Sequence, residues 1–260
     1  MKNSELSSLA NILEEKMSSE PMIEINHLRK RFGKLEVLKD VSLKLFNGEN
    51  LIVLGKSGSG KSVLIKCIVR LLNPDGGTVK MLGKKANTLK GENLNELRKK
   101  IGFLFQSGAL YDSMTVKQNL EFPLRRIKRS LNEQEITDKV NEVLENVGLA
   151  DVLDKMPSEL SGGMRKRISL SRSIILDPKI MLYDEPTTGL DPVTSDEISN
   201  LINSVQEKYK TSSIIITHDI ACVRLTADRI IMLHDGQVYA EGKLSEFEES
   251  KDPLVMSFFK

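Results

Sequence analysis

A glycine-rich segment directly after an apolar run constrains the fold most. The apolar run covers residues 51–54, and a helix-like stretch, VLIKCIVRLL, follows the glycines. Glycines allow backbone N–H groups to approach phosphate oxygens closely, and the start of the next helix would turn its positive end toward the same anion. The pattern G-x-x-x-x-G-K-[ST] predicts a phosphate-binding loop, made of Gly55, Lys56, Ser57, Gly58, Ser59, Gly60, Lys61 and Ser62.

The last residues of this loop have separate predicted roles. Lys61 would reach the β- and γ-phosphates as a point charge, and the hydroxyl of Ser62 would bind Mg²⁺. A chance glycine loop is the alternative interpretation. The apolar strand before the motif and the helical stretch after it favour phosphate binding, because the motif has meaning only in that context.

Composition narrows the class of protein. The chain has 38 basic and 36 acidic residues, a net charge of +2, so it lacks the overall charge that attracts nucleic acid, although local basic clusters remain possible. Cys67 and Cys222 lie in apolar helical contexts without metal-site spacing, which predicts buried free thiols in a reducing compartment. No apolar run approaches the ~18 residues of a membrane span. We therefore expect a cytoplasmic protein.

Two kinds of apolar pattern predict a mixed sheet within an α/β fold. Continuous apolar runs at 51–54, 180–183 and 213–217 are typical of parallel strands covered on both faces. Alternation at 23–25 and 37–45 predicts half-exposed antiparallel strands instead. Helices must separate the parallel strands, because parallel neighbours need crossover connections.

A long polar insert, roughly residues 106–178, predicts a helical subdomain. Asn132 and Glu135 have the spacing of a helix N-cap pair. The apolar residues after them follow helical spacing: Ile136, Val140, Val143, Leu144 and Val147.

The ends of the chain differ from its main domain, which we place at 21–245. Residues 1–20 predict an N-terminal extension that is either a short amphipathic helix or a frayed tail. The dipeptide Asp235-Gly236 between two strand-like runs predicts a hairpin. The tail, 246–260, is apolar near its end, so it either packs on its own core or contacts another subunit or protein.

Two adjacent carboxylates end the apolar run at 180–183. Asp184 is suited to hold Mg²⁺, and Glu185, whose side chain points elsewhere, could polarise an attacking water. Acids at strand ends are common, so the pair alone is weak evidence. A chain that also carries a phosphate-binding loop makes the functional interpretation much stronger.

The sequence LSGGM at 160–164 places Ser161, Gly162 and Gly163 at the start of a predicted helix, which makes a second candidate anion site. An ordinary N-cap is the alternative. For the basic residues that follow, we expect a solvated helix face: Arg165, Lys166, Arg167 and Arg172.

LSGGM, lying between the phosphate-binding loop and the strand that ends in Asp184 and Glu185, resembles the signature loop of ATP-binding-cassette (ABC) ATPases. The resemblance covers about residues 22–245. It implies a P-loop NTPase fold with an ABC-type mixed core sheet, an antiparallel β subdomain and an inserted helical subdomain. It also implies ATP and Mg²⁺ as cofactors and ATP hydrolysis as the activity.

Further residues take roles from this resemblance. Phe32 matches the aromatic residue that stacks on adenine, Gln106 the glutamine that senses Mg²⁺, and His218 the histidine that contacts the γ-phosphate. Gly189, Leu190 and Asp191 resemble the loop through which two protomers communicate. Alone, Phe32 could be a core residue, and a lone Gln or His would carry no functional meaning.

The resemblance implies a homodimer with two ATP sites. In this family each nucleotide lies between the phosphate-binding loop of one protomer and the signature loop of the other. A second helix N-terminus would exclude water and add donors to the charged transition state. Reciprocal contacts of this kind give a two-fold dimer.

The segment from Gln106 to Val116, with Asn119 and residues 122–126, resembles ATPase subunits of Mla-type phospholipid transporters. Those work with a membrane permease and a lipid-binding protein of the mammalian-cell-entry (MCE) type, on the cytoplasmic face of the inner membrane. A nutrient-importer ATPase shares every catalytic motif and remains an alternative. A soluble ABC ATPase, including one acting on nucleic acids, is a weaker alternative, because duplicated cassettes, zinc insertions and strongly basic additions are missing from the sequence.

Two residues of the phosphate-binding loop region depart from the family pattern. Lys56 replaces the usual proline, and Val63 replaces the usual threonine after Ser62. We expect Lys56 to be exposed and harmless. Val63 has no side-chain hydroxyl to offer near the α-phosphate, so only its backbone N–H remains as a donor there. We therefore expect a modest change in ATP affinity.

Overall fold

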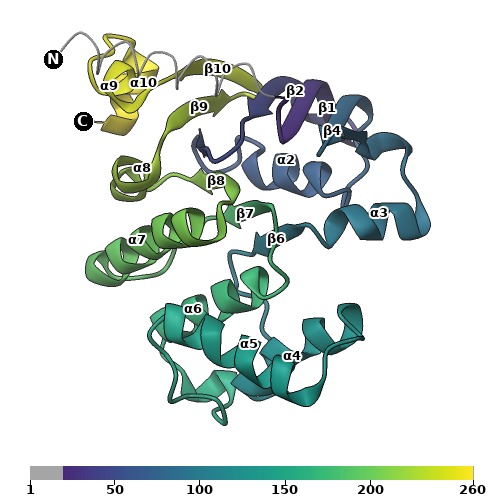
Figure 1. The fold of residues 1–260 in the computed structure, drawn as a ribbon. Helices are drawn as coiled ribbons and strands as arrows, with labels where there is room; N and C mark the ends of the chain where they lie inside the picture. The colour runs from purple at the N-terminus through teal and green to yellow at the C-terminus, as the bar shows by residue number, and fades with distance from the viewer. Residues whose placement is uncertain (1–19, 260) are drawn as a thin grey trace, which may run out of the picture.

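The computed structural model describes residues 20–259 (Figure 1). The predicted N-terminal extension lies outside the described residues, except for Glu20. One ten-stranded sheet runs through the fold in the order β5-β4-β1-β2-β10-β9-β3-β8-β7-β6. Its strands are β1 Ile23–Phe32, β2 Leu35–Leu45, β3 Asn50–Leu54, β4 Gly76–Met81, β5 Lys84–Lys85, β6 Ile101–Leu104, β7 Ile180–Asp184, β8 Ser212–Thr217, β9 Arg229–His234 and β10 Gln237–Gly242.

Helices connect and cover these strands. The α-helices are α2 Lys61–Ile68, α3 Gly91–Arg98, α4 Val116–Ile127, α5 Glu133–Asn146, α6 Gly162–Ile174, α7 Pro192–Tyr209, α8 Ile220–Thr226, α9 Leu244–Glu248 and α10 Pro253–Phe259. Two short 3₁₀ helices, Ala86–Thr88 and Pro157–Glu159, lie in connections.

The predicted central strands are confirmed. β3, β7 and β8 are buried along their whole length, and they pair in parallel with β8 in the middle. β6 and β9 extend the parallel set on either side. The carboxyl ends of these strands therefore meet at one edge of the sheet, where α/β folds place ligands.

The two faces of the parallel sheet pack against different helices. Because strand side chains alternate, Leu51 and Val53 join the cluster that contains α2, whereas Ile52 and Leu54 join the cluster that contains α7 and α8. Figure 1 shows α2 and α3 on one side of the sheet and α7 and α8 on the other. Cys67 and Cys222 are buried, one in each cluster, and both are free, as expected.

The antiparallel strands form a wing beside the parallel ones. β1 pairs with β2 and β4, which confirms the prediction from alternating residues. Asp235 and Gly236 have φ values of 47° and 73° and form the tight turn between β9 and β10. The wing joins the rest of the sheet through one parallel pair, Gln237 with Asp40, and a hydrogen bond of 2.8 Å from Lys39 N to Gly236 O.

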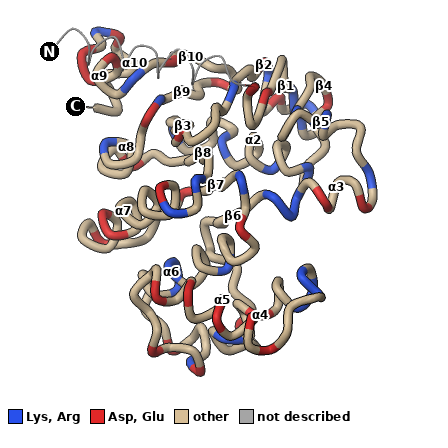
Figure 2. The backbone as a smooth tube through the Cα atoms, viewed as in Figure 1, with Lys and Arg blue, Asp and Glu red and all other residues tan. Residues whose placement is uncertain are grey.

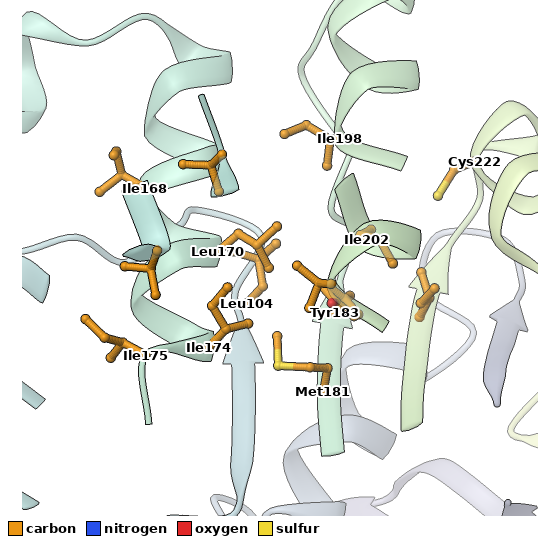
Figure 3. Packing of buried hydrophobic residues seen from close by; sticks show 14 of the residues in the cluster. Leu104, Ile168, Leu170, Ile174, Ile175, Met181, Tyr183, Ile198, Ile202 and Cys222 are labelled. Carbon is orange, nitrogen blue, oxygen red and sulfur yellow. The ribbon is translucent and has the colours of Figure 1, made fainter. Parts of the chain in front are cut away.

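Helices α4, α5 and α6 lie together below the sheet in Figure 1. The side chain of Asn132 accepts from Glu135 N, and Glu135 reaches back to Asn132 N, so the predicted capping pair starts α5. Ile174 of α6 packs with Leu104 and Met181 of the sheet (Figure 3). This packing joins the helical insert and the sheet in one core. That the helical insert forms a separate subdomain, with boundaries at about residues 106 and 178, stays a prediction.

The C-terminal tail docks on its own chain. Val255 of α10 is buried, and the rings of Phe247 and Phe259 lie 6.0 Å apart. Leu254 and Phe258 pack against the same core cluster. The structure therefore shows the tail docked on its own core, and contact of the tail with another subunit or protein stays a prediction.

No helix within residues 20–259 combines the length and the apolar character of a bilayer span. Basic and acidic residues are both spread over all parts of the described fold (Figure 2). The sequence has a small net charge, and its basic and acidic residues are also mixed throughout the described fold.

Candidate nucleotide site

The predicted phosphate-binding loop connects β3 to α2 at the carboxyl edge of the parallel strands. Gly60 has a φ of 100°, and a Cβ there would come within 2.9 Å of Leu38 Cδ2. At Gly55 a Cβ would lie 2.6 Å from Leu233 O. Both positions therefore require glycine, one for its backbone angle and both for close packing. Lys56 is exposed, as expected.

Lys61 is held against the loop that it follows. Its Nζ donates to Gly55 O at 2.6 Å and to Lys56 O at 3.1 Å, and it lies 3.4 Å from Glu185 Oε1. The side chain is buried, so its charge acts in a low-dielectric environment. An anion entering the loop would meet a cation that is already positioned.

Asp184 ends β7 beside the start of α2. Ser62 Oγ donates to Asp184 Oδ1 at 2.9 Å. Burial raises the pKa of Asp184, and the neighbouring charge of Glu185 adds to this, while the hydrogen bond from Ser62 opposes it. Asp184 is only 5% exposed, so ionising its carboxyl costs free energy that a nearby cation would offset.

Glu185 adopts a left-handed backbone conformation, with φ 51°. Its N–H donates to Ile216 O at 2.9 Å, which fixes the turn after β7 to the end of β8. Its Oε2 lies 2.8 Å from His218 Nδ1 and accepts from Thr188 Oγ1 at 3.2 Å. A non-glycine residue in this conformation stores strain, which is typical of functional sites.

These elements surround a cavity of about 260 Å³. The structure thus brings most of the predicted site residues together at the carboxyl ends of β3, β7 and β8. The lining consists of Val37, Ser57, Gly58, Gly60, Lys61, Ser62, Val63, Gln106, Glu185 and His218.

The residues present fit Mg²⁺ bound together with a nucleotide. Mg²⁺ prefers oxygen ligands and is usually held by one or two carboxylates plus substrate phosphates and water. Ser62 and Asp184 supply a hydroxyl and a carboxylate, and Gln106 lines the same cavity. Within residues 20–259 no group of three or more His, Cys, Asp or Glu could form an all-protein metal cage.

The predicted signature loop lies outside this cavity. Ser161 caps α6, and its Oγ accepts from Met164 N at 3.2 Å. Asp191 caps α7 and accepts from Thr194 N at 3.0 Å and from Thr194 Oγ1 at 2.6 Å; these two hydrogen bonds lower the pKa of its carboxyl. Gly163 is so close to Thr194 that a Cβ would approach Thr194 Cγ2 to 2.6 Å. The two loops therefore pack on each other and present Ser161 and Asp191 to the outside.

Phe32 stands at the end of β1 and is 47% exposed. Lys30 Nζ lies 5.4 Å from the centre of its ring. The ring does not line the cavity around the phosphate-binding loop, so the structure leaves it available for stacking without placing it in contact with that loop.

Sequence reasoning missed two residues and misjudged a third. Val37 lines the cavity, and Thr188 contacts Glu185, but neither belongs to a charge or glycine pattern that would single it out. Lys166, expected on a solvated face, is instead buried at 6% exposure, and its Nζ donates to Gln106 O. Burial lowers the pKa of Lys166, while the charges of Asp184 and Glu185 oppose that shift.

Comparison with known sequences places this geometry in a family. Residues 38–188, more than half of the chain, match the family described as "ABC transporter". The Arabidopsis thaliana protein TRIGALACTOSYLDIACYLGLYCEROL 3 is 39% identical over 92% of this chain and 74% of its own length. The Mycobacterium tuberculosis "Probable ribonucleotide transport ATP-binding protein mkl" is 40% identical over 91% of this chain and 66% of its own length.

A methionine import ATP-binding protein of Oceanobacillus iheyensis is 38% identical over 85% of this chain and 65% of its own length. The chain thus spans about two thirds of the mycobacterial and Oceanobacillus relatives.

Solved structures agree in fold. A dimeric ATP-binding cassette in a post-hydrolysis state, bound to ADP and Pi, superimposes with a TM-score of 0.79 at 33% identity, covering 86% of this chain and 99% of that one. The Clostridium perfringens cbiO1 structure, part of an ABC transporter complex, gives 0.80 at 29% identity, covering 88% and 90%. The expected P-loop NTPase fold with a mixed sheet is confirmed. This chain belongs to the ABC transporter ATPase family.

Proposed function

We propose that the protein binds and hydrolyses ATP as the nucleotide-binding subunit of a phospholipid transporter. The observation that carries the ATPase part is the cavity in which Lys61, Glu185 and His218 meet at the glycine-rich loop. A carboxylate that lies close to both a buried cation and an imidazole suits phosphoryl transfer to water.

Binding would use the loop and the helix behind it. The N–H groups from Ser57 to Val63 and the positive end of α2 would hold the phosphates, and Lys61 would exchange its contacts with Gly55 O and Lys56 O for phosphate oxygens. Phe32 would stack on the adenine. Mg²⁺, held by Ser62, Asp184 and Gln106, would neutralise charge on the phosphates.

The turn after β7 would supply the base. Glu185 is fixed by its backbone bond to Ile216 O and by His218, so its carboxylate can accept a proton from an attacking water. The 8% exposure of Glu185 limits competition from bulk solvent. His218, which is more exposed, would contact the γ-phosphate from the open side of the cavity.

The exposed signature loop supports action as a homodimer. Ser161, Gly162, Gly163 and Asp191 present donors and a helix N-terminus outward, where they would close the cavity of a second copy. The structural relative that holds ADP and Pi is itself dimeric. Each copy would contribute one half of each of two ATP sites.

The proposal that the transported substrate is a phospholipid is based on the segment after Gln106 and on the relatives. Tyr111 is 45% exposed and meets the ring of Phe122 at 5.3 Å, so this segment offers an aromatic surface to a permease. The name of the plant relative refers to a galactolipid. We infer a permease and an MCE-type lipid-binding protein as partners, with this chain peripheral on the cytoplasmic face of the inner membrane and no role for nucleic acid.

Purification of the tagged protein from solubilised membranes, followed by mass spectrometry of proteins and lipids, tests the proposal. A permease with an MCE-type protein and phospholipid, together with ATP hydrolysis by the complex, is the expected result. A different permease with a solute-binding protein would support nutrient import instead, for which the methionine import relative is the precedent. Absence of any membrane partner would support a soluble ABC ATPase.

A further inference from the structure

One face of α6 holds the loop that begins at Gln106. Lys166 Nζ donates to Gln106 O at 2.5 Å, and Arg172 Nη2 donates to Ala109 O at 2.7 Å. Between them, Gly108 packs so closely that a Cβ would lie 2.6 Å from Ser169 Oγ. Residues 166, 169 and 172 are three apart, so they form one stripe along the helix.

The loop is also pinned at its far end. Asn119 is fully buried, and its Oδ1 accepts from Tyr111 N at 2.8 Å while Arg172 Nη1 lies 3.3 Å away. The Arg172 guanidinium stacks over the Tyr111 ring at 5.4 Å. The path of residues 106–111 is therefore set by side chains outside the loop.

Lys166 is an unusual member of this stripe because it is a buried cation. Its charged end donates to a backbone carbonyl, and none of the carboxylates in residues 20–259 lies within 4.0 Å of it. The charges of Asp184 and Glu185 offset only part of the cost of burying this ammonium, and a neutral side chain of similar volume would avoid that cost. A purely structural role does not explain a lysine here.

The same helix begins at the signature loop. Ser161 caps α6, and five residues at a rise of about 1.5 Å separate it from Lys166, which is roughly 7.5 Å along the axis. A helix is stiff over that distance. A movement of the capped end of α6 would therefore be carried to Gln106, at the mouth of the nucleotide cavity.

We propose that Lys166 is a positioning residue, which holds the backbone of Gln106 against the signature helix and so sets where the Gln106 side chain lies in the nucleotide cavity. The consequence for catalysis rests on the proposed ATPase function. The hydrogen bond between Lys166 and Gln106 does not depend on that function, so the bond and its catalytic consequence can be tested separately.

Kinetics of three variants test the catalytic consequence. Lys166→Met removes the hydrogen bond with little change in volume, Lys166→Gln keeps a neutral donor, and Ser171→Ala is the control. Ser171 is buried on another side of α6 and donates to Val143 O at 3.2 Å and to Arg167 O at 3.1 Å, away from the loop. We expect Lys166→Met to lower kcat by about 10-fold or more with KM for ATP within about twofold, because misplacement of a positioned group acts on the chemical step.

Partial recovery of kcat by Lys166→Gln and an unchanged kcat in Ser171→Ala would complete the expected pattern. An unchanged kcat in Lys166→Met, or equal losses in Lys166→Met and Ser171→Ala, would overturn the positioning role. Thermal melts establish that each variant is folded, and Lys166→Leu, which also lacks a donor, replaces Lys166→Met if the latter is not.

Amide hydrogen exchange of the nucleotide-free protein gives a readout independent of activity. Residues 107–112 should exchange faster in Lys166→Met than in the wild type, and at the wild-type rate in Ser171→Ala. Unchanged exchange in Lys166→Met would overturn the proposal. A wild-type chain without ATP hydrolysis would refute the proposed function, whereas the exchange experiment would still decide whether Lys166 holds the loop.

Discussion

The phosphate-binding loop and the signature loop are both glycine-containing starts of helices, yet they have opposite surroundings. Lys61 and Asp184 are buried next to the first loop and are already joined to it by hydrogen bonds. Ser161 and Asp191 cap their own helices on the surface. The first loop faces a cavity in its own chain, and the second faces outward.

Because of this difference, the two loops should contribute to ATP hydrolysis in different ways. The phosphate-binding side has charge, donors and a base within a single chain, so it should bind nucleotide alone. The signature side has donors with nothing to bind among residues 20–259. Its effect should therefore appear only when two copies meet.

The largest expected effect comes from Glu185→Gln. The amide cannot accept the proton of an attacking water, so we expect kcat for ATP hydrolysis to fall by about 100-fold or more, with ATP still bound. The variant should accumulate as an ATP-bound dimer in size-exclusion chromatography. Glu248→Gln, an exposed change on α9, is the control. Hydrolysis by Glu185→Gln at the wild-type rate would refute the role of Glu185.

A change on the signature side should separate binding from turnover. In Gly163→Ala the new Cβ would clash with Thr194, so the start of α6 must shift. We expect hydrolysis to fall by about 10-fold while the Kd for ATP of the monomer stays within about twofold, because the other loop does the binding. Gly76→Ala, where a Cβ would meet Arg29 at an ordinary 3.5 Å, should change neither. Equal loss of ATP binding in Gly163→Ala would remove the distinction between the two sides.

Asp184→Asn should make the nucleotide-free protein more stable at neutral pH while abolishing activity. Burial raises the folded pKa of Asp184 above its unfolded value, so ionisation penalises the folded state as pH rises through that interval. Below the unfolded pKa, near 3.9, both states are protonated and the advantage of asparagine should vanish. Thermal melts of both proteins across pH measure this. A lower melting temperature for Asp184→Asn at pH 7 would contradict it.

The smallest effect concerns the two cysteines, Cys67 on α2 and Cys222 on α8, which lie in the clusters on the two faces of the sheet. Burial raises the pKa of Cys67 and of Cys222 to about 11. We therefore expect both thiols to react with a thiol reagent at neutral pH at least about 100-fold more slowly than a free thiol. Fast labelling of Cys67 would show that the α2 side of the sheet opens in solution, and fast labelling of Cys222 would show the same for the α8 side. Labelling of the denatured chain is the reference.

Most of the architecture could be predicted from local patterns. Continuous apolar runs predicted β3, β7 and β8 because burial on both faces leaves no polar positions. Asn132 with Glu135 and Asp235-Gly236 predicted a helix start and a turn because each depends on a few neighbouring residues. The phosphate-binding loop was recognisable for the same reason.

Features that depend on distant segments were not predictable from the sequence. The basic residues of α6 suggested a solvated face, but Lys166 is buried and donates to the carbonyl of Gln106, which lies 60 positions away in the sequence. Similarly, Val37 reaches the cavity because the antiparallel wing lies beside the loop. No pattern within a single element specifies such a neighbour.

The single pair that joins the wing to the rest of the sheet has a consequence for synthesis on the ribosome. Asp40 and its neighbours are made before their partners at the turn between β9 and β10, because 196 positions separate Lys39 from Asp235 in the sequence. β1, β2 and β4 can pair with one another long before that. We therefore expect the nascent chain to carry a folded wing whose β2 edge is exposed to chaperones until β9 and β10 have been made.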